Sequence, residues 1–312
     1  MPNLRPGANG RPVRLGGGLG VRSGDAHEPA SPSTTQSVPV FYDSALTAQG
    51  FPSPLLHMQI NGHEATFLVD SGASTHVLAD WFVTAAAIPT SETDSTAQGS
   101  SGKTTRERVA RSLAGHWGDG QPFHLNQAVV VSFPPSFESL HIGGLISPQL
   151  LAPPETAAVL DLKTPSLHFA PFTHAMSDLS ASRASHTPAC RNRNSIFENR
   201  QYVTPVSVGN TTDLMLVDTG ATKTIFSRGS ATAQVIESHS EAGTASESVG
   251  GDVDARRVVH GVRLFRGGQS IALDPSLGGV SPPCNAKGIL GMDALRGCVL
   301  TLGDGEMALS CK

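Results

Sequence analysis

Two short segments of the 312-residue chain each place an aspartate beside a small hydroxyl residue and a glycine. They are Asp70-Ser71-Gly72-Ala73 and Asp218-Thr219-Gly220-Ala221. An apolar run precedes each of them, at 67–69 and 215–217, and such a run is typical of a buried strand. Two carboxylates at strand-to-turn junctions that face each other would build a paired-aspartate site. In such a site the two carboxyls share one proton and activate one water between them.

Either tripeptide alone is an ordinary turn sequence, because Asp, Ser and Gly are common in turns. The landmarks around the two copies, however, repeat in the same order. Before each aspartate, two apolar segments flank a hairpin signal, Asn61-Gly62 in the first copy and Gly209-Asn210 in the second. A glycine follows each aspartate by 32 residues, at Gly102 and Gly250. The halves match over about 110 residues each, and we interpret this as an internal duplication.

A third landmark in each half is an apolar pair followed by a small residue. It is Leu145-Ile146-Ser147 in the first half and Ile289-Leu290-Gly291 in the second. A stretch that favours a helical turn follows each, at 148–151 and 292–295. Short segments rich in Val, Leu and Ile, with few charged residues, predict a mainly β chain whose best helix candidate is 79–87.

These motifs resemble those of the retropepsin-like aspartic proteases, in a single-chain form with two fused retropepsin-type lobes. The resemblance covers residues 54–172 and 202–312, and it implies a mainly β, two-lobed aspartic protease fold with an internal duplication. In that family a later hydrophobic-hydrophobic-Gly motif passes beside the catalytic aspartate in a ψ-shaped loop. Gly291 matches its glycine, whereas Ser147 stands where the family has glycine. A serine would carry strain there if the position required a positive φ.

The resemblance also implies a role for each matched residue. Asp70 and Asp218 would be catalytic, one as general base on the water and the other as hydrogen-bond donor to the scissile carbonyl. The hydroxyls of Ser71 and Thr219 would join the two motifs by reciprocal hydrogen bonds. The assigned sets are dyad support (Ser71, Gly72, Ala73, Thr219, Gly220, Ala221), the ψ-loop (Leu145, Ile146, Ser147, Ile289, Leu290, Gly291) and two flap hairpins at 97–108 and 241–254 (Gly99, Gly102, Gly250, Gly251). No metal or organic cofactor is needed, because side chains activate the water.

The sequence therefore predicts an aspartic endopeptidase that hydrolyses peptide bonds of an extended peptide or protein substrate bound between the lobes. Because the dyad forms within one chain, we expect a monomer to be sufficient. The alternative is a catalytically silent member of the same fold that binds peptide or protein segments. A net charge of −4 with scattered signs disfavours a nucleic-acid partner. The chain has no 18-residue apolar stretch, and we expect no membrane span.

For the organisation of the chain we expect a disordered segment at 1–36, lobes at 37–172 and 202–312, and an interlobe linker at 173–201. The four cysteines suit two disulfides in an oxidising compartment, and buried free thiols fit the sequence equally well. No signal peptide is visible, and the compartment stays open, with an exported or periplasmic location favoured by the even cysteine count. His76 and His141 lie close in sequence to the motifs, and we interpret them as surface or structural residues.

Overall fold

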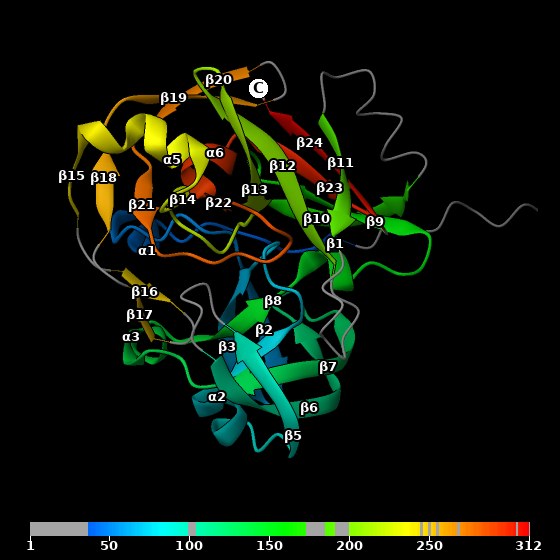
Figure 1. The fold of residues 1–312 in the computed structure, drawn as a ribbon. Coiled ribbons are helices and arrows are strands. Elements are labelled where there is room, and N and C mark those ends of the chain that lie inside the picture. The colour runs from blue at the N-terminus through cyan, green and yellow to red at the C-terminus, as the bar shows by residue number, and fades with distance from the viewer. Residues whose placement is uncertain are drawn as a thin grey trace, which may run out of the picture. The chain divides into compact units, whose positions relative to one another are not determined.

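The computed structural model describes residues 37–98, 104–172, 185–190, 200–243, 246–248, 251–253, 256–266, 269–303 and 305–311. These residues are mainly in β-strands, as the sequence predicted (Figure 1). The strands form a seven-stranded sheet, a fifteen-stranded sheet and a separate two-stranded hairpin. None of the helices in the described ranges is both long and apolar enough to cross a membrane.

The seven-stranded sheet is built from the first half of the chain, in the order β2-β3-β8-β4-β7-β6-β5. Its strands are β2 (Leu55–Ile60), β3 (His63–Val69), β4 (Val77–Ala79), β5 (Thr90–Gln98), β6 (Thr104–Trp117), β7 (Pro122–Val131) and β8 (Ile142–Ile146). β2 also pairs with β6. The helices of this half are α1 (Ser44–Ala48), α2 (Asp80–Ala85), α3 (Pro135–Ser139) and the 3₁₀ turn η1 (Pro148–Leu150). The predicted helix at 79–87 is α2, and the predicted helical turn at 148–151 is η1.

The second half repeats this order as β12-β13-β22-β14-β21-β18-β15, which demonstrates the internal duplication. Its strands are β12 (Gln201–Val208), β13 (Thr211–Val217), β14 (Ile225–Ser227), β15 (Ser240–Ala242), β18 (Arg257–Val259), β19 (Val262–Arg266), β20 (Gln269–Leu273), β21 (Ser276–Gly278) and β22 (Gly288–Leu290). β19 pairs with β12 as β6 pairs with β2. The long strand β6 therefore corresponds to the two short strands β18 and β19, and the long strand β7 corresponds to β20 and β21. The helices of this half are α5 (Ala231–Ile236), η2 (Glu237–His239) and α6 (Met292–Leu295), and α6 lies at the predicted helical turn.

The hairpins that end the two halves pair with each other. They are β9 (Thr156–Asp161) with β10 (Ser166–Pro171) and β23 (Cys298–Leu302) with β24 (Glu306–Cys311). β9 pairs antiparallel with β23, and β1 (Ser37–Val38) adds to β10. β11 (Ser185–Cys190) pairs with both β24 and β12. The predicted linker at 173–201 therefore contains a strand of the large sheet, which its polar composition did not indicate.

Local sequence explains how each aspartate reaches its place. Asn61 and Gly62 have φ angles of 51° and 80°, the left-handed conformation of a tight hairpin turn, and they join β2 to β3. The last three residues of β3 are almost fully buried, as are those of β13. A strand buried on both faces has an uninterrupted apolar sequence, which is the run that precedes each aspartate. In both halves the aspartate is the first residue after this strand.

In each half one strand, here called the crossing strand, passes beside the aspartate between two others; it is β8 in the first half and β22 in the second. β8 pairs in parallel with β3 and antiparallel with β4, and β22 does the same with β13 and β14. Ser147 follows β8 with φ −78° and ψ 108°, an ordinary extended conformation. The substitution of serine for glycine therefore brings no backbone strain. The Ser147 hydroxyl is buried and donates a hydrogen bond to the Ala73 carbonyl at 2.9 Å.

Gly291, at the equivalent position after β22, has φ −96° and is not in the left-handed region. Its constraint is space, because a Cβ there would lie 2.5 Å from both the carbonyl carbon and the oxygen of Lys223. A backbone group cannot move aside as the end of a flexible side chain can. The two lobes therefore differ in their tolerance of a side chain at this point.

Three cysteines of the second half, Cys284, Cys298 and Cys311, are in disulfides. Cys298 and Cys311 face each other across β23 and β24 and are bonded. Cys284 is disulfide-bonded as well. Of the two possibilities that the sequence left open, disulfides and not free thiols are present in this part of the chain.

We predict that exchanging the small residues at these two positions has unequal effects. Gly291→Ser should lower the free energy of unfolding by about 2 kcal/mol or more, because the Lys223 backbone must shift. Ser147→Gly should lower it by only about 1 kcal/mol, since it removes one hydrogen bond and adds backbone freedom. Urea unfolding of both variants measures the difference. Equal stability of the two variants would contradict the steric explanation.

Candidate active site

The backbones of Asp70 and Asp218 are held by the crossing strands. The Asp70 amide donates to the Ile146 carbonyl at 2.8 Å, and the Asp218 amide donates to the Leu290 carbonyl at 3.1 Å. Both carbonyls belong to the last residue of a crossing strand, β8 or β22. The ψ-loop segments that the sequence singled out therefore lie directly against the two aspartates.

The carboxyls of the two aspartates meet. Asp70 is only 8% exposed, Asp218 is partly buried, and the two side chains are close enough for each to shift the pKa of the other. Asp70 Oδ1 accepts the amides of Gly72 and Ala73 at 2.8 and 3.0 Å. Asp218 Oδ1 accepts the amides of Gly220 and Ala221 at 2.8 and 2.9 Å. The same turn thus holds each carboxyl through backbone N–H donors, which leaves the second oxygen for the partner carboxyl or a substrate.

Each motif glycine packs against the carboxyl of the other motif. A Cβ at Gly72 would lie 2.6 Å from Cγ of Asp218, and a Cβ at Gly220 would lie 2.6 Å from Cγ of Asp70. No heavier side chain fits without separating the two carboxyls. The glycines are needed for close approach between the motifs.

The hydroxyls of Ser71 and Thr219 tie the motifs together. The Ser71 amide donates to Thr219 Oγ1 at 3.0 Å, and the Thr219 amide donates to Ser71 Oγ at 3.2 Å. Each hydroxyl then donates to a carbonyl of the opposite half, Ser71 to Val217 at 2.9 Å and Thr219 to Val69 at 2.6 Å. All these groups are buried, so breaking any bond would leave unsatisfied polar atoms. The pair of aspartates is therefore held in register by four buried hydrogen bonds.

Burial changes the acidity of both carboxyls. Desolvation raises the pKa of Asp70, and it raises the pKa of Asp218 well above the usual range. The charge of Asp70 raises the pKa of Asp218 further. The hydrogen bond between the carboxyls lowers the pKa of Asp70 and raises that of Asp218. The two carboxyls therefore hold one proton between them over a range of pH, and they titrate as one unit.

Two glutamines also hold the first motif, and the sequence gave no reason to single them out. Gln149 Nε2 donates to the carbonyls of Ala73 and Arg200, both at 3.0 Å. Gln201 Nε2 donates to the Gly72 carbonyl at 2.6 Å. Both glutamine side chains are buried. Alignment of the two halves could have drawn attention to Gln149, which lies two residues after Ser147, as Asp293 lies two after Gly291.

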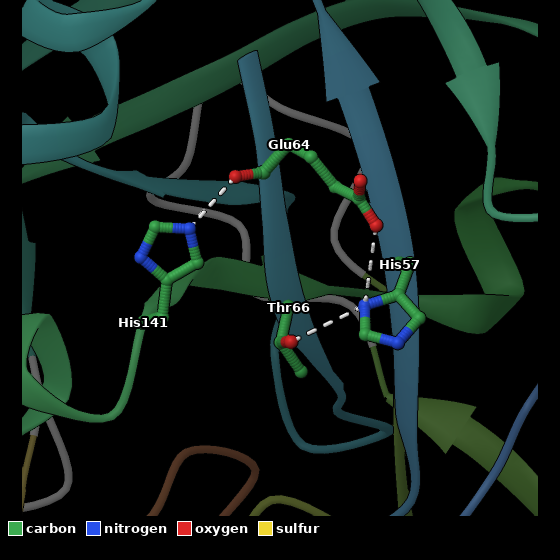
Figure 2. Close-up of polar contacts among 4 residues, drawn as sticks. All are labelled: His57, Glu64, Thr66 and His141. Atoms are coloured by element: carbon green, nitrogen blue, oxygen red, sulfur yellow. Dashed lines mark hydrogen bonds and ion pairs between the residues drawn. The ribbon is translucent and has the colours of Figure 1, made fainter.

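The two histidines near the motifs have different places. His76 is 5% exposed, and its Nδ1 accepts the Ser147 amide at 3.2 Å. His141 is exposed and bonds instead to the Glu64 carbonyl at 2.9 Å, beside the contacts of His57 with Glu64 and Thr66 (Figure 2). His141 is thus a surface residue of the first lobe, and His76 is buried next to the ψ-loop.

The flap candidates are only partly within the described residues. β5 and β6 pair as a hairpin, and β16 (Ser246–Ser248) pairs with β17 (Gly251–Val253). Gly251 begins β17, whereas Gly99, Gly102 and Gly250 lie outside the described residues. Among the residues that the structure describes, no three His, Cys, Asp or Glu side chains gather as a metal-ligand set.

Comparisons with known proteins bear on the family and the fold. The sequence model of the aspartyl protease family matches residues 56–116, and no curated protein matches the sequence. An aspartic proteinase from Irpex lacteus has 14% identity and a TM-score of 0.48, over 89% of this chain and 98% of that one. Basic 7S globulin from soybean has 10% identity and a TM-score of 0.47, with 89% and 95% covered.

Conglutin gamma, a basic 7S globulin from lupine seeds, has 11% identity and a TM-score of 0.50, again over 89% of this chain and 95% of that one. This likeness extends over both halves and concerns the fold alone. The family match runs from β2 to β6 and includes the first aspartate motif. The family match over 56–116 and the likeness of the two-lobed fold together support an aspartic protease-like family for this chain.

Proposed function

We propose that the protein is an aspartic endopeptidase, with Asp70 and Asp218 as its catalytic residues. The observation that carries the proposal is the close approach of two poorly solvated carboxyls, each held by two backbone N–H groups and each packed against the glycine of the other motif. Burial and mutual repulsion keep one proton on the pair, and a dyad in this state contains both a base and an acid. No other group is needed for peptide hydrolysis by an activated water.

The mechanism follows from the single proton that the pair of aspartates holds. The ionised carboxyl of the pair takes a proton from a water while the water oxygen bonds to the scissile carbonyl carbon. The protonated carboxyl passes its proton to the carbonyl oxygen, which gives a neutral tetrahedral diol. When the C–N bond breaks, the leaving nitrogen takes the proton from the first carboxyl, and the second carboxyl recovers one from a hydroxyl of the diol. The dyad is then back in its starting state.

The substrate would be an extended peptide or protein segment between lobes 37–172 and 202–312. The hairpins β5–β6 and β16–β17 stand at equivalent places after the two motifs and are the candidates for covering it. Both catalytic groups come from one chain, so a monomer suffices. Catalytically silent peptide binding is the second candidate function, because a seed globulin also has this fold and the fold alone does not imply catalysis.

We predict that Asp70→Asn and Asp218→Asn each lower kcat/KM for a denatured casein-like substrate between pH 3 and 7 by about 10³-fold or more. Each substitution removes one half of the acid–base pair and leaves the shape nearly unchanged. Inhibition by pepstatin, recorded in the same assay, tests the dyad separately.

Asp161→Asn is the matched control for this experiment. Asp161 Oδ1 accepts the amides of Lys163 and Thr164 at 2.8 and 3.0 Å, the same turn pattern as in the dyad, but Asp161 is the last residue of β9. We expect this variant to keep wild-type activity. A folded wild-type protein that cleaves nothing yet binds peptides would establish the silent binding module instead.

The pKa shifts also predict a pH dependence of stability. A carboxyl whose pKa is higher in the folded state than in the unfolded state holds an extra proton when folded, so its contribution to stability falls as the pH rises above 3.8. In Asp218→Asn this side chain no longer titrates, so its pH-dependent loss of stability is removed. The unfolding free energy of the wild type, minus that of Asp218→Asn, should therefore become more negative from pH 4 to pH 7.

Urea unfolding at several pH values within this range provides the measurement. Titrating groups outside the dyad are common to both proteins and cancel in the difference, so the difference reports on the dyad. A difference that stays constant with pH would show that the dyad carries no raised pKa.

A further inference from the structure

Six residues after each aspartate, a side chain accepts a hydrogen bond from the small residue that follows the crossing strand. In the first half, His76 Nδ1 accepts the Ser147 amide at 3.2 Å. In the second half, Thr224 Oγ1 accepts the Gly291 amide at the same distance, 3.2 Å. The two contacts occupy equivalent positions of the duplicated fold, although imidazole and hydroxyl are different chemical groups.

The peptide group contacted in this way also supports the aspartate. The Ser147 amide and the Ile146 carbonyl belong to one planar peptide unit. His76 binds its N–H, and the Asp70 amide binds its oxygen at 2.8 Å. Because the unit is rigid, its tilt is set from both sides, and a change at His76 is transmitted to the Asp70 backbone. The Leu290–Gly291 unit lies between Thr224 and Asp218 in the same manner.

The second half adds a carboxylate to this arrangement. Asp293 Oδ1 accepts both the hydroxyl and the amide of Thr224, at 2.7 and 2.8 Å. The equivalent residue of the first half, Gln149, bonds instead to carbonyls of the first aspartate motif. In the first half the imidazole thus takes the place of the hydroxyl as acceptor at this position.

The ring must be neutral to act as this acceptor. A backbone amide can only donate, so Nδ1 carries the lone pair and the ring proton is on Nε2. Burial lowers the pKa of His76 to about 4, which keeps the ring neutral above that pH. The groups that bond to His76 from neighbouring elements, the Ser147 amide after β8 and the Val129 amide of β7, are uncharged.

We propose that His76 is a positioning residue, whose Nδ1 orients the Ile146–Ser147 peptide and through it the Asp70 carboxyl. Its role matches that of Thr224 in the other half. The effect on catalysis rests on the proposed endopeptidase function, whereas the effect on the peptide unit does not.

Two amide substitutions separate this role from simple packing. The side-chain oxygen of Asn stands near the place of Nδ1, and that of Gln near the place of Nε2. His76→Asn therefore keeps the acceptor, and His76→Gln loses it while remaining polar. We expect kcat to fall about 10²-fold in His76→Gln, with KM nearly unchanged, and to recover by at least about tenfold in His76→Asn.

His124→Gln is the control, since His124 is an exposed residue of β7, and it should behave as wild type. If His76→Asn and His76→Gln lose the same activity, or if both keep full activity, His76 does not position Asp70.

A second readout needs no catalysis. In wild-type protein, ¹⁵N NMR should show the His76 ring as the Nε2–H tautomer, and amide hydrogen exchange should show Ser147 protected. Exchange at Ser147 should become faster in His76→Gln than in His76→Asn. A ring with its proton on Nδ1, or equal exchange in both variants, would overturn the proposal even if the wild-type protein were inactive. Absence of proteolysis with the expected NMR result would instead overturn only the endopeptidase function.

Discussion

Two carboxyl groups lie close together in a poorly solvated site, and the surrounding structure has to make this arrangement stable. Ionising both in a poorly solvated site is unfavourable, and leaving both without donors would be costly too. The turn after each strand answers the second problem, because Gly72 and Gly220 are the first of two amide donors to their own aspartate. The same glycines also bear on the ionisation of the pair. Because they have no Cβ, the opposite carboxyl can approach, and the two carboxyls can then share one proton. The glycine in each motif therefore serves both the carboxyl of its own turn and that of the other lobe.

Much of this arrangement could be predicted, because its determinants are local. Apolar runs, the Asn61-Gly62 turn and the repeated order of landmarks lie within short windows of sequence, and the strands formed where they indicated. β11 was missed, because its pairing with β24 and β12 depends on segments distant in sequence. Gln149 and Gln201 were missed for the same reason, as their partners are backbone carbonyls that carry no sequence signature. At Ser147 the sequence raised a question of φ, whereas the constraint in the structure is space at Gly291, and Lys223 creates it.

The duplication preserves geometry more strictly than chemistry. Equivalent positions carry Ser147 and Gly291, and His76 and Thr224, and in both pairs the backbone contact survives the change of side chain. The buried carboxylate of Asp293, whose pKa is raised by desolvation, supports only the second half. A single chain permits this divergence, because each half has to fit only the other and not a copy of itself.

His76 and the dyad respond to pH in opposite directions. The pKa of His76 is lowered from 6.5 to about 4, so the folded protein binds one proton fewer there than the unfolded chain, and stability falls as the pH drops through this range. The raised pKa of Asp218 means one proton more in the folded state above pH 3.8, and stability falls as the pH rises. Between pH 4 and 6.5 the two shifts therefore change the stability in opposite directions. Burial favours the neutral form of both groups, and this raises the pKa of a carboxyl and lowers the pKa of an imidazole.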